Sequence, residues 1–364
     1  MSLTEKNTKP NVTSSHNRDL NMTENKTPDL PAEYAEAVVA VKGLKKYFPI
    51  KQGFLSSVLS GENLFVRAVD DVSFYVKKGE VFGLAGESGS GKSTCGRLML
   101  RLTDPTGGQI FFKGKDITRL SQRVIKPLRK EMQIIFQDPY ESLDSRMIIK
   151  EIVAEPIRIQ HLARTEDEVD ERVKRILTEV EMVPPEEFMY RFPHELSGGQ
   201  RQRVAVARAF VVDPEFVVAD EPVSMLDVSI RAEVLNAMLE LVQKRQVSFI
   251  YITHDLALAK HVCDRIAILY LGKIVEMGPT EEVINNPLHP YTQALIAAIP
   301  VPDPNYRRGN LPISGEIPSP INPPMACRFH TRCPYAFTEC TQAEPPLVEL
   351  EPGHWAACHM MRKY

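Results

Sequence analysis

The chain has 364 residues, of which 43% are hydrophobic and 25% charged, a composition typical of a globular protein with one large core. The formal net charge of −3 argues against a general nucleic-acid or membrane-surface binder. No run approaches the roughly 18 apolar residues of a membrane-spanning helix, and the polar N-terminal stretch lacks the hydrophobic segment of a signal peptide. We therefore expect a cytoplasmic protein.

The N-terminal part of the chain combines a polar tail with predicted strands. Residues 1–34 are rich in Asn, Thr, Ser and Lys and predict a disordered tail. Alternating apolar residues from Ala37 predict a first strand, and a loop is expected over Pro49–Arg67. Two further strands are predicted at residues 68–76 and, after a turn, at residues 80–85.

The middle of the chain alternates between helical and strand patterns. Apolar spacing predicts helices from about Asp138 to Phe210. The continuously apolar segments 214–220 and 247–255 are typical of buried strands in a parallel sheet. Residues 265–278 have the pattern of a hairpin.

A change in composition follows the predicted hairpin. The segment Pro300–Pro324 contains eight prolines, which exclude a regular helix or a central strand there. We therefore place a domain boundary near residue 279. The predicted units are a tail over 1–34, a main domain over 35–278 and an extension over 279–364.

The segment Gly86–Thr94, GESGSGKST, matches the phosphate-loop pattern G-x-x-x-x-G-K-[ST] and follows an apolar strand. Its glycines let backbone N–H groups point at phosphates, Lys92 can reach the β- and γ-phosphates, and the Ser93 hydroxyl can bind Mg²⁺. The following helix adds its N-terminal dipole. The predicted ATP contacts are Gly86, Glu87, Ser88, Gly89, Ser90, Gly91, Lys92, Ser93 and Thr94.

A second chemical signal is the apolar strand FVVADE, which ends in Asp220 and Glu221. Asp220 suits a Mg²⁺ partner through water. Glu221, one residue later, is placed to act as the general base on the attacking water. Such an acidic pair is a weak signal alone, but it becomes strong when it follows a phosphate loop in the same chain.

Between these motifs lies LSGGQRQRVAVARAF, in which Ser197 and two glycines open a helix and form another anion-holding N-terminus. LSGGQ is similar to the signature of ATP-binding-cassette proteins, and the resemblance extends over residues 38–278. It implies a P-loop NTPase (RecA-like) α/β core, an antiparallel β subdomain, a helical signature subdomain and a small irregular C-terminal extension. It also implies that the signature completes the ATP site of a partner subunit, through Ser197, Gly198, Gly199 and Gln200.

The remaining family elements occur in the expected order. Gln137 resembles the Q-loop residue that contacts Mg²⁺ and the attacking water, and His254 resembles the switch histidine on the γ-phosphate. The family stacks an aromatic ring on adenine, and Phe48 fits the usual spacing better than Tyr47. The implied sets are catalytic Glu221, His254 and Gln137; Mg²⁺-binding Ser93, Gln137 and Asp220; and, at the dimer interface, the D-loop residues Ser224, Met225, Leu226 and Asp227.

The extension carries a second resemblance. Its segments HPYTQALIAAIP, GEIPSP and CRFHTRCP resemble the C-terminal region of ATPase subunits from dipeptide and oligopeptide importers. This implies an energy-coupling ATPase on the cytoplasmic face of the cell membrane, working with a second cassette subunit, two transmembrane permease subunits and, indirectly, an extracytoplasmic solute-binding protein. Because the subfamily also imports nickel, glutathione and oligosaccharides, peptide is an expectation about the solute.

Six cysteines in a cytoplasmic chain are not expected to form structural disulfides. Cys95 and Cys263 are expected to be buried as small apolar side chains. The other four follow the pattern C-x5-C-x6-C-x17-C, which suits Zn²⁺ or an iron–sulfur cluster and does not exclude unliganded thiols. The spacing is wider than in usual zinc sites, and the importer subunits that the chain resembles carry a [4Fe–4S] cluster. The predicted ligands are Cys327, Cys333, Cys340 and Cys358.

Two other classes of protein could carry some of these motifs. Soluble cassette ATPases that act on ribosomes or nucleic acid usually have two cassettes, coiled-coil insertions or basic arms, and this chain has one cassette and a negative net charge. A cluster-based sensor without productive ATPase activity would have a degenerate site, whereas all the motifs here are intact. We therefore expect an ATPase without a nucleic-acid partner.

Overall fold

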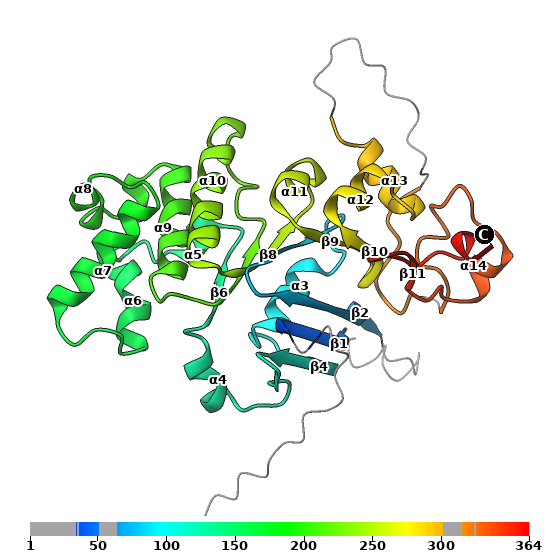
Figure 1. The fold of residues 1–364 in the computed structure, drawn as a ribbon, viewed down its shortest axis with the longest axis horizontal. Coiled ribbons are helices and arrows are strands. Elements are labelled where there is room, and N and C mark those ends of the chain that lie inside the picture. Colours follow the sequence, from blue (N-terminus) through cyan, green and yellow to red (C-terminus); the bar gives the residue numbers. More distant parts are fainter. Residues whose placement is uncertain are drawn as a thin grey trace, which may run out of the picture.

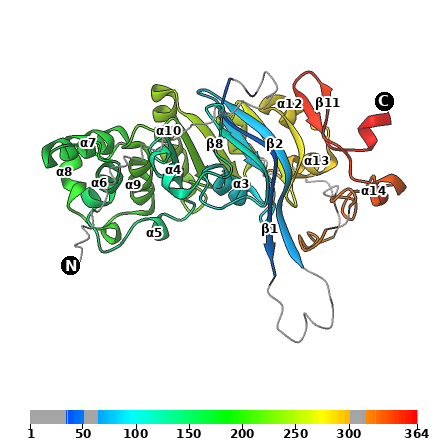
Figure 2. The ribbon, with the colours of Figure 1, turned by 90° about the horizontal axis from the view of Figure 1, so that it is seen from below.

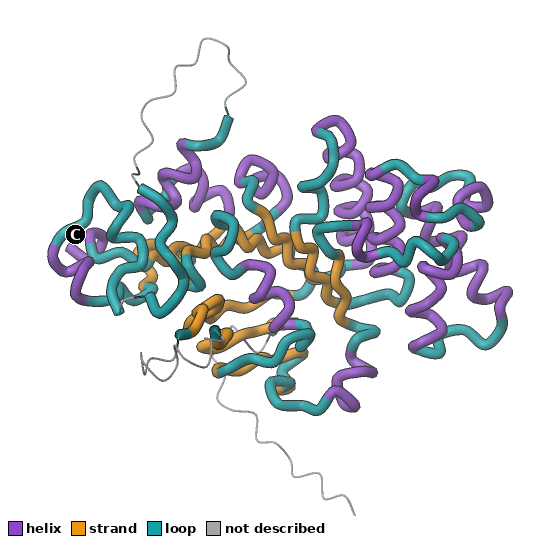
Figure 3. The backbone as a smooth tube through the Cα atoms, turned by 180° about the vertical axis from the view of Figure 1, so that it is seen from behind, coloured by secondary structure: helices purple, strands orange, loops and turns teal. Residues whose placement is uncertain are grey.

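The computed structural model describes residues 34, 36–50, 64–300, 313, 315–323 and 325–363. The predicted disordered tail over 1–34 lies outside these residues except for Tyr34, as does most of the predicted loop over Pro49–Arg67. Two sheets and the helices around them form the layers seen in Figures 1 and 3.

The central sheet has eight strands in the order β11-β12-β10-β9-β3-β8-β7-β6. Its middle strands pair in parallel, and every residue of β3, β7 and β8 is buried, as expected for strands covered on both faces. Three of the predicted buried strands are thereby confirmed. The strands are β3 (Val81–Ala85), β6 (Met132–Ile135), β7 (Phe216–Asp220), β8 (Ser248–Thr253), β9 (Arg265–Tyr270), β10 (Lys273–Pro279), β11 (Val348–Glu351) and β12 (His354–Ala356).

A smaller antiparallel sheet packs beside the central one, on the same side as helix α3 (Figures 1 and 3). Its second strand begins at Phe65, inside the predicted loop, because Phe65 and Val66 pair with Pro49 and Phe48 of the first strand. The loop is therefore shorter than the sequence indicated. The strands are β2 (Phe65–Lys77), β1 (Ala37–Pro49), β4 (Gly107–Phe112) and β5 (Lys115–Asp116), in that order across the sheet.

Helices α5 to α9 form a lobe at one end of the molecule, within the range predicted to be helical (Figure 1). Local sequence explains the helices: α7 starts at the N-cap Thr165, whose side chain accepts a hydrogen bond from the Glu168 amide, and buries Val169, Val173 and Ile176 at helical spacing. The helices and 3₁₀ turns are α3 (Lys92–Met99), α4 (Gln122–Leu128), α5 (Pro139–Ser142), α6 (Ile149–Ile159), α7 (Glu166–Glu179), α8 (Pro185–Met189), η1 (Pro193–Glu195), α9 (Gly198–Phe210), α10 (Val228–Arg245), α11 (Leu256–Val262), α12 (Thr280–Asn285), α13 (Pro290–Ala297), α14 (Thr338–Gln342) and η2 (Met360–Lys363).

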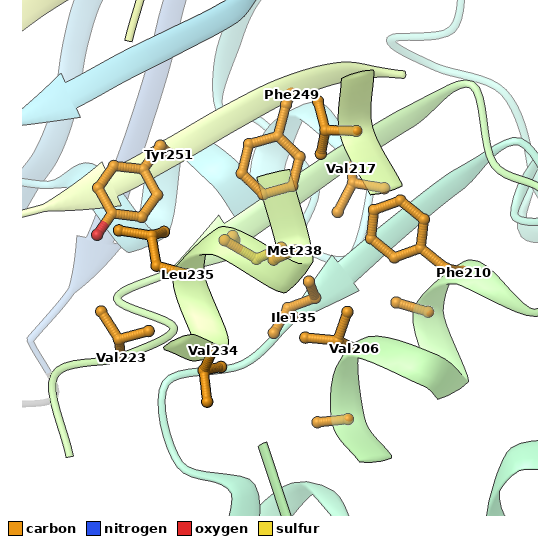
Figure 4. Packing of buried hydrophobic residues seen from close by; sticks show 14 of the residues in the cluster. Ile135, Val206, Phe210, Val217, Val223, Val234, Leu235, Met238, Phe249 and Tyr251 are labelled. Carbon is orange, nitrogen blue, oxygen red and sulfur yellow. The ribbon is translucent and has the colours of Figure 1, made fainter. Parts of the chain in front are cut away.

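A shared apolar core joins this lobe to the central sheet (Figure 4). Val206 and Phe210 of α9 pack in the same cluster as Met238 of α10 and Val217 and Phe249 of the sheet. Because interiors are close-packed, α9 cannot shift without disturbing the strands that carry the acidic pair. Cys95 and Cys263 are both buried in apolar clusters, which confirms the expectation for them.

The C-terminal extension is part of the central sheet and lies at the opposite end of the molecule from α7 and α8 (Figure 2). Strand β12 pairs antiparallel with β10, with Glu276 opposite Ala356 and Met277 opposite Trp355. The β11–β12 hairpin was not predicted from the sequence, because both strands are short and follow a proline-rich stretch.

A buried carboxylate fixes the extension to the sheet. Glu276 of β10 is fully buried and lies 2.8 Å from Nε2 of His354 in β12. The amides of Leu288 and His289 also donate to its two carboxylate oxygens, at 2.8 and 2.9 Å. Burial lowers the pKa of His289 to about 4, so its neutral ring accepts a hydrogen bond from the Tyr291 amide. One side chain therefore holds β10, β12 and the start of α13 together.

In the ranges that the structure describes, no helix is long and apolar enough to cross a membrane.

Candidate ATP-hydrolysis site

The phosphate loop joins β3 to α3 in a conformation that requires glycine at two positions. Gly86 and Gly91 have φ values of 145° and 106°. A Cβ at Gly86 would lie 2.2 Å from the carbonyl oxygen of Leu269, and one at Gly91 would lie 2.1 Å from that of Ala68. The loop is thus packed against backbone on both sides, so no other residue fits at either position.

Lys92 is folded into this loop. Its Nζ donates to the carbonyl oxygens of Gly86 and Glu87 at 2.8 and 2.9 Å. Burial lowers the pKa of Lys92, while the carboxylates of Glu221 and Asp220 oppose this shift. The side chain is therefore a desolvated cation held within the loop, suited to binding phosphate oxygens.

Two oxygen ligands meet beside the loop. The Ser93 hydroxyl donates to Oδ1 of Asp220, which ends β7, at 2.8 Å. Burial raises the pKa of Asp220, and the hydrogen bond from Ser93 opposes that shift. A hydroxyl and a carboxylate in contact are hard donors of the kind that Mg²⁺ prefers, and the pair fits the predicted metal position.

The three residues predicted to be catalytic also meet. Oε2 of Glu221 lies 3.2 Å from Nε2 of Gln137 and 3.0 Å from Nδ1 of His254. These residues follow β7, β6 and β8, which are neighbours in the sheet, so the shared carboxyl edge of parallel strands explains their convergence. Glu221 has φ of 47°, a conformation uncommon outside glycine and typical of functional positions.

The signature and the D-loop lie against each other. Ser197 caps α9, exchanging hydrogen bonds with Gln200 at 3.0 and 3.3 Å. A Cβ at Gly199 would lie 2.5 Å from Cγ2 of Ile230 in α10, so glycine lets the two helices approach. Among the described residues, no hydrogen bond or ion pair joins the signature to the phosphate loop of the same chain.

The D-loop connects Glu221 to the surface. The Ser224 hydroxyl donates to the Glu221 carbonyl at 3.0 Å, and Leu226 is buried. Met225 is 61% exposed, and Val228, just after Asp227, is 80% exposed. This exposed apolar surface next to the site is available to a second subunit.

The two candidate adenine-stacking residues differ in their surroundings. The Tyr47 hydroxyl donates to Asp70, its ring lies under Arg67, and burial together with the Asp70 hydrogen bond raises the pKa of Tyr47 to about 12. Phe48 is 40% exposed, and its described ring contact is with Lys46. The structure therefore leaves the Phe48 ring more accessible.

The four C-terminal cysteines line one small cavity, together with His330 and His359. Burial raises the pKa of Cys327 to about 12 and also raises the pKa of Cys333 and of Cys358. As the side chains are placed in the described ranges, no three His, Cys, Asp or Glu residues form a metal-binding group.

An ion pair that was not predicted from the sequence joins Glu87 of the phosphate loop to Arg332 of the extension. Arg332 donates to both carboxylate oxygens of Glu87, at 2.7 and 3.0 Å. No local pattern could have revealed this contact, because the two residues are 245 positions apart.

Comparison with known proteins agrees with this arrangement. The ABC transporter family model matches residues 69–224, and the model of the oligopeptide/dipeptide transporter C-terminal region matches residues 275–340. The oligopeptide transport ATP-binding protein AppF of Bacillus subtilis is 46% identical over 334 residues, covering 91% of this chain and 99% of AppF.

Solved structures are similar over the cassette. A dimeric post-hydrolysis ATP-binding cassette, MJ0796 bound to ADP and Pi, has a TM-score of 0.58 and 27% identity, covering 66% of this chain and 98% of that chain. CbiO1 from Clostridium perfringens also has a TM-score of 0.58 and 27% identity, and the match covers 69% of this chain and 92% of the CbiO1 chain. The protein therefore belongs to the ATP-binding-cassette family of transporter ATPases, in the branch with the oligopeptide/dipeptide transporter C-terminal region.

Proposed function

We propose that this chain is the ATP-hydrolysing, energy-coupling subunit of a di- or oligopeptide importer. The observation that carries the proposal is the convergence of Gln137, Glu221 and His254 beside the Ser93–Asp220 pair. The peptide-transport relative and the matched C-terminal region support the class of solute.

The residues have distinct roles in ATP hydrolysis. Phe48 stacks on adenine, and the phosphate-loop amides with Lys92 hold the phosphates. Ser93 and Asp220, with Gln137, would hold Mg²⁺, which neutralises charge on the transferred phosphoryl group. Glu221 accepts the proton of the attacking water, which Gln137 orients. His254 donates a hydrogen bond to the γ-phosphate and stabilises the negative charge that develops there in the transition state.

The subunit works in a pair of cassettes. Because no hydrogen bond or ion pair among the described residues joins the signature to the phosphate loop of its own chain, Ser197–Gln200 can cap ATP bound to a second cassette subunit, and the exposed Met225 would lie in the contact between the two. That second subunit is a different polypeptide. The pair sits on two transmembrane permease subunits at the cytoplasmic face of the membrane, and an extracytoplasmic solute-binding protein delivers the peptide.

A reconstitution experiment tests this function. The purified chain alone should hydrolyse ATP poorly, since each composite site lacks half of its residues, and activity should rise when the second cassette and the permeases are added. Peptide-loaded solute-binding protein should raise it further. Full activity of the isolated chain would contradict the heteromeric assembly, and co-sedimentation with ribosomes instead of permeases would contradict the transport role.

The cysteine cavity is the second part of the proposal. The four cysteines line one cavity and supply sulfur donors of the kind that bind a [4Fe–4S] cluster; from their positions in the described ranges, the side chains would have to move toward one another to hold it. Cys327, Cys333, Cys340 and Cys358 would hold it. The cluster would be structural, because it would cross-link a segment that has little apolar core of its own. Zn²⁺ is the alternative metal.

Metal analysis of protein purified without oxygen distinguishes these possibilities. We expect iron and acid-labile sulfide in equal amounts, about four of each per chain. Replacement of Cys340 by Ser should lower both, while replacement of the buried Cys95, which lies in another part of the core, should leave them unchanged. Zinc alone would support a structural metal site and contradict the iron–sulfur cluster. Protein without any metal would contradict both the cluster and the zinc site.

A further inference from the structure

The segment 327–333, CRFHTRC, links the cysteine cavity to the base of the ATP site. We call it the arginine loop, because Arg328 and Arg332 lie between its two cysteines. Both arginines are buried, and Arg332 is only 5% exposed. Buried arginines are rare unless they are paired, so their partners indicate what the loop does.

Arg332 holds the phosphate loop directly. Its guanidinium binds the Glu87 carboxylate through two hydrogen bonds, the geometry that is most specific for arginine. Glu87 is also held by its backbone, since its amide donates to the Tyr291 hydroxyl at 2.9 Å and its carbonyl accepts from Lys92. The ring of Phe329 packs against those of Tyr270 and Tyr291 and fills the space behind this contact.

Arg328 supports the same loop from the other side. Its guanidinium donates to the carbonyl of Leu271, in the β9–β10 turn, and to the Asp70 carboxylate. The next residue of that turn, Gly272, donates its amide to the Ser90 carbonyl at 2.8 Å. Asp70 in turn accepts from Tyr47, the neighbour of Phe48. Arg328 is therefore connected to the phosphate loop and to the predicted adenine-binding residue.

We propose that the arginine loop positions the ATP site, with Arg332 as a positioning residue for the phosphate loop. The inference rests on the proposed function, because it assumes that ATP binds at Gly86–Thr94. Two physical effects act together: the ion pair fixes the backbone at Glu87, and it neutralises a carboxylate that would otherwise repel the triphosphate.

The cysteine cavity reaches the phosphate loop through this element. Cys327 and Cys333 bound the arginine loop and line the cavity. The Cys327 amide donates to the carbonyl of Cys340, across the cavity, at 3.0 Å. Because Cys327 and Cys333 are the two ends of the arginine loop and share the cavity with Cys340, a change in what these sulfurs bind would act on the backbone that carries both arginines.

The test is equilibrium binding of a fluorescent ATP analogue to the full chain, which does not require hydrolysis. Arg332→Gln should weaken binding about 10-fold, because the bidentate contact with Glu87 is lost and the uncompensated Glu87 charge then repels the triphosphate. Arg332→Lys, which keeps the charge, should recover a large part of this loss. Arg245→Gln is the matched control, because Arg245 is also mostly buried and pairs with Glu179 and Asp213, on the side of the lobe. The Arg245→Gln variant should have lower thermal stability and an unchanged affinity for the ATP analogue.

A double-mutant cycle separates positioning from general damage. If Arg332 acts through Glu87, then Arg332→Gln should have little effect in a Glu87→Gln background. Cys340→Ser should weaken binding in the wild-type chain and add little to Arg332→Gln. Equal affinity of Arg332→Gln and wild type, or full additivity in the Glu87 cycle, would overturn the inference. A wild-type chain that fails to bind ATP would instead overturn the proposed function.

Discussion

Glu221→Gln should bind ATP normally and hydrolyse it about 10²–10⁴-fold more slowly, the usual effect of removing a general base. The amide keeps the size of the side chain and can still contact Gln137 and His254, but it cannot accept the proton of the attacking water. The experiment identifies the nucleotide bound to this chain in the assembled transporter over time. In the variant, the bound nucleotide should remain ATP.

The control for this variant is Glu215→Gln. Glu215 is an exposed glutamate that directly precedes β7, the strand that leads to Glu221. Its side chain forms an ion pair with Lys113. Its replacement removes the same charge without touching the site, so ATP hydrolysis should be unchanged. If the Glu221 variant converts retained ATP to ADP at the wild-type rate, Glu221 is not the general base.

Glu276→Ala should lower the free energy of unfolding by several kcal/mol, because it leaves buried polar groups without a partner and each such group costs about 1–3 kcal/mol. The change leaves His354 without its carboxylate and leaves the amides of Leu288 and His289 without acceptors, all in a region closed to water. Denaturant unfolding followed by circular dichroism measures the loss.

Two other variants make this prediction specific. Glu215→Ala breaks an exposed pair and should cost only about 0–1 kcal/mol. Glu276→Gln keeps one acceptor oxygen and should fall between the two. An equal loss for Glu276→Ala and Glu215→Ala would show that the buried carboxylate does not hold the extension in place.

The residues of the ATP site could be predicted from local motifs in the sequence. Each of its motifs is short and carries its own backbone conformation, such as the glycines of Gly86–Thr94 or the strand that ends at Asp220. Because buried parallel strands present their carboxyl ends at one edge, motifs that follow β3, β6, β7 and β8 had to meet there. Gln137 and His254 were grouped with Ser93 and Glu221 through the resemblance to cassette proteins, and the arrangement of the strands gives the physical reason for that grouping.

The way in which the extension joins the cassette could not be predicted from the sequence, because it depends on contacts between distant residues. The Arg332–Glu87 and His354–Glu276 pairs connect residues that are 245 and 78 positions apart. The sequence around Arg332 or His354 does not predict which residue each one binds. The strands β11 and β12 are likewise too short to show periodicity, and pairing with β10 creates them. Residues in a local motif are close together because of their spacing in the sequence, whereas the partners of a buried hydrogen-bonded pair are close together only because the folded chain packs their segments against each other.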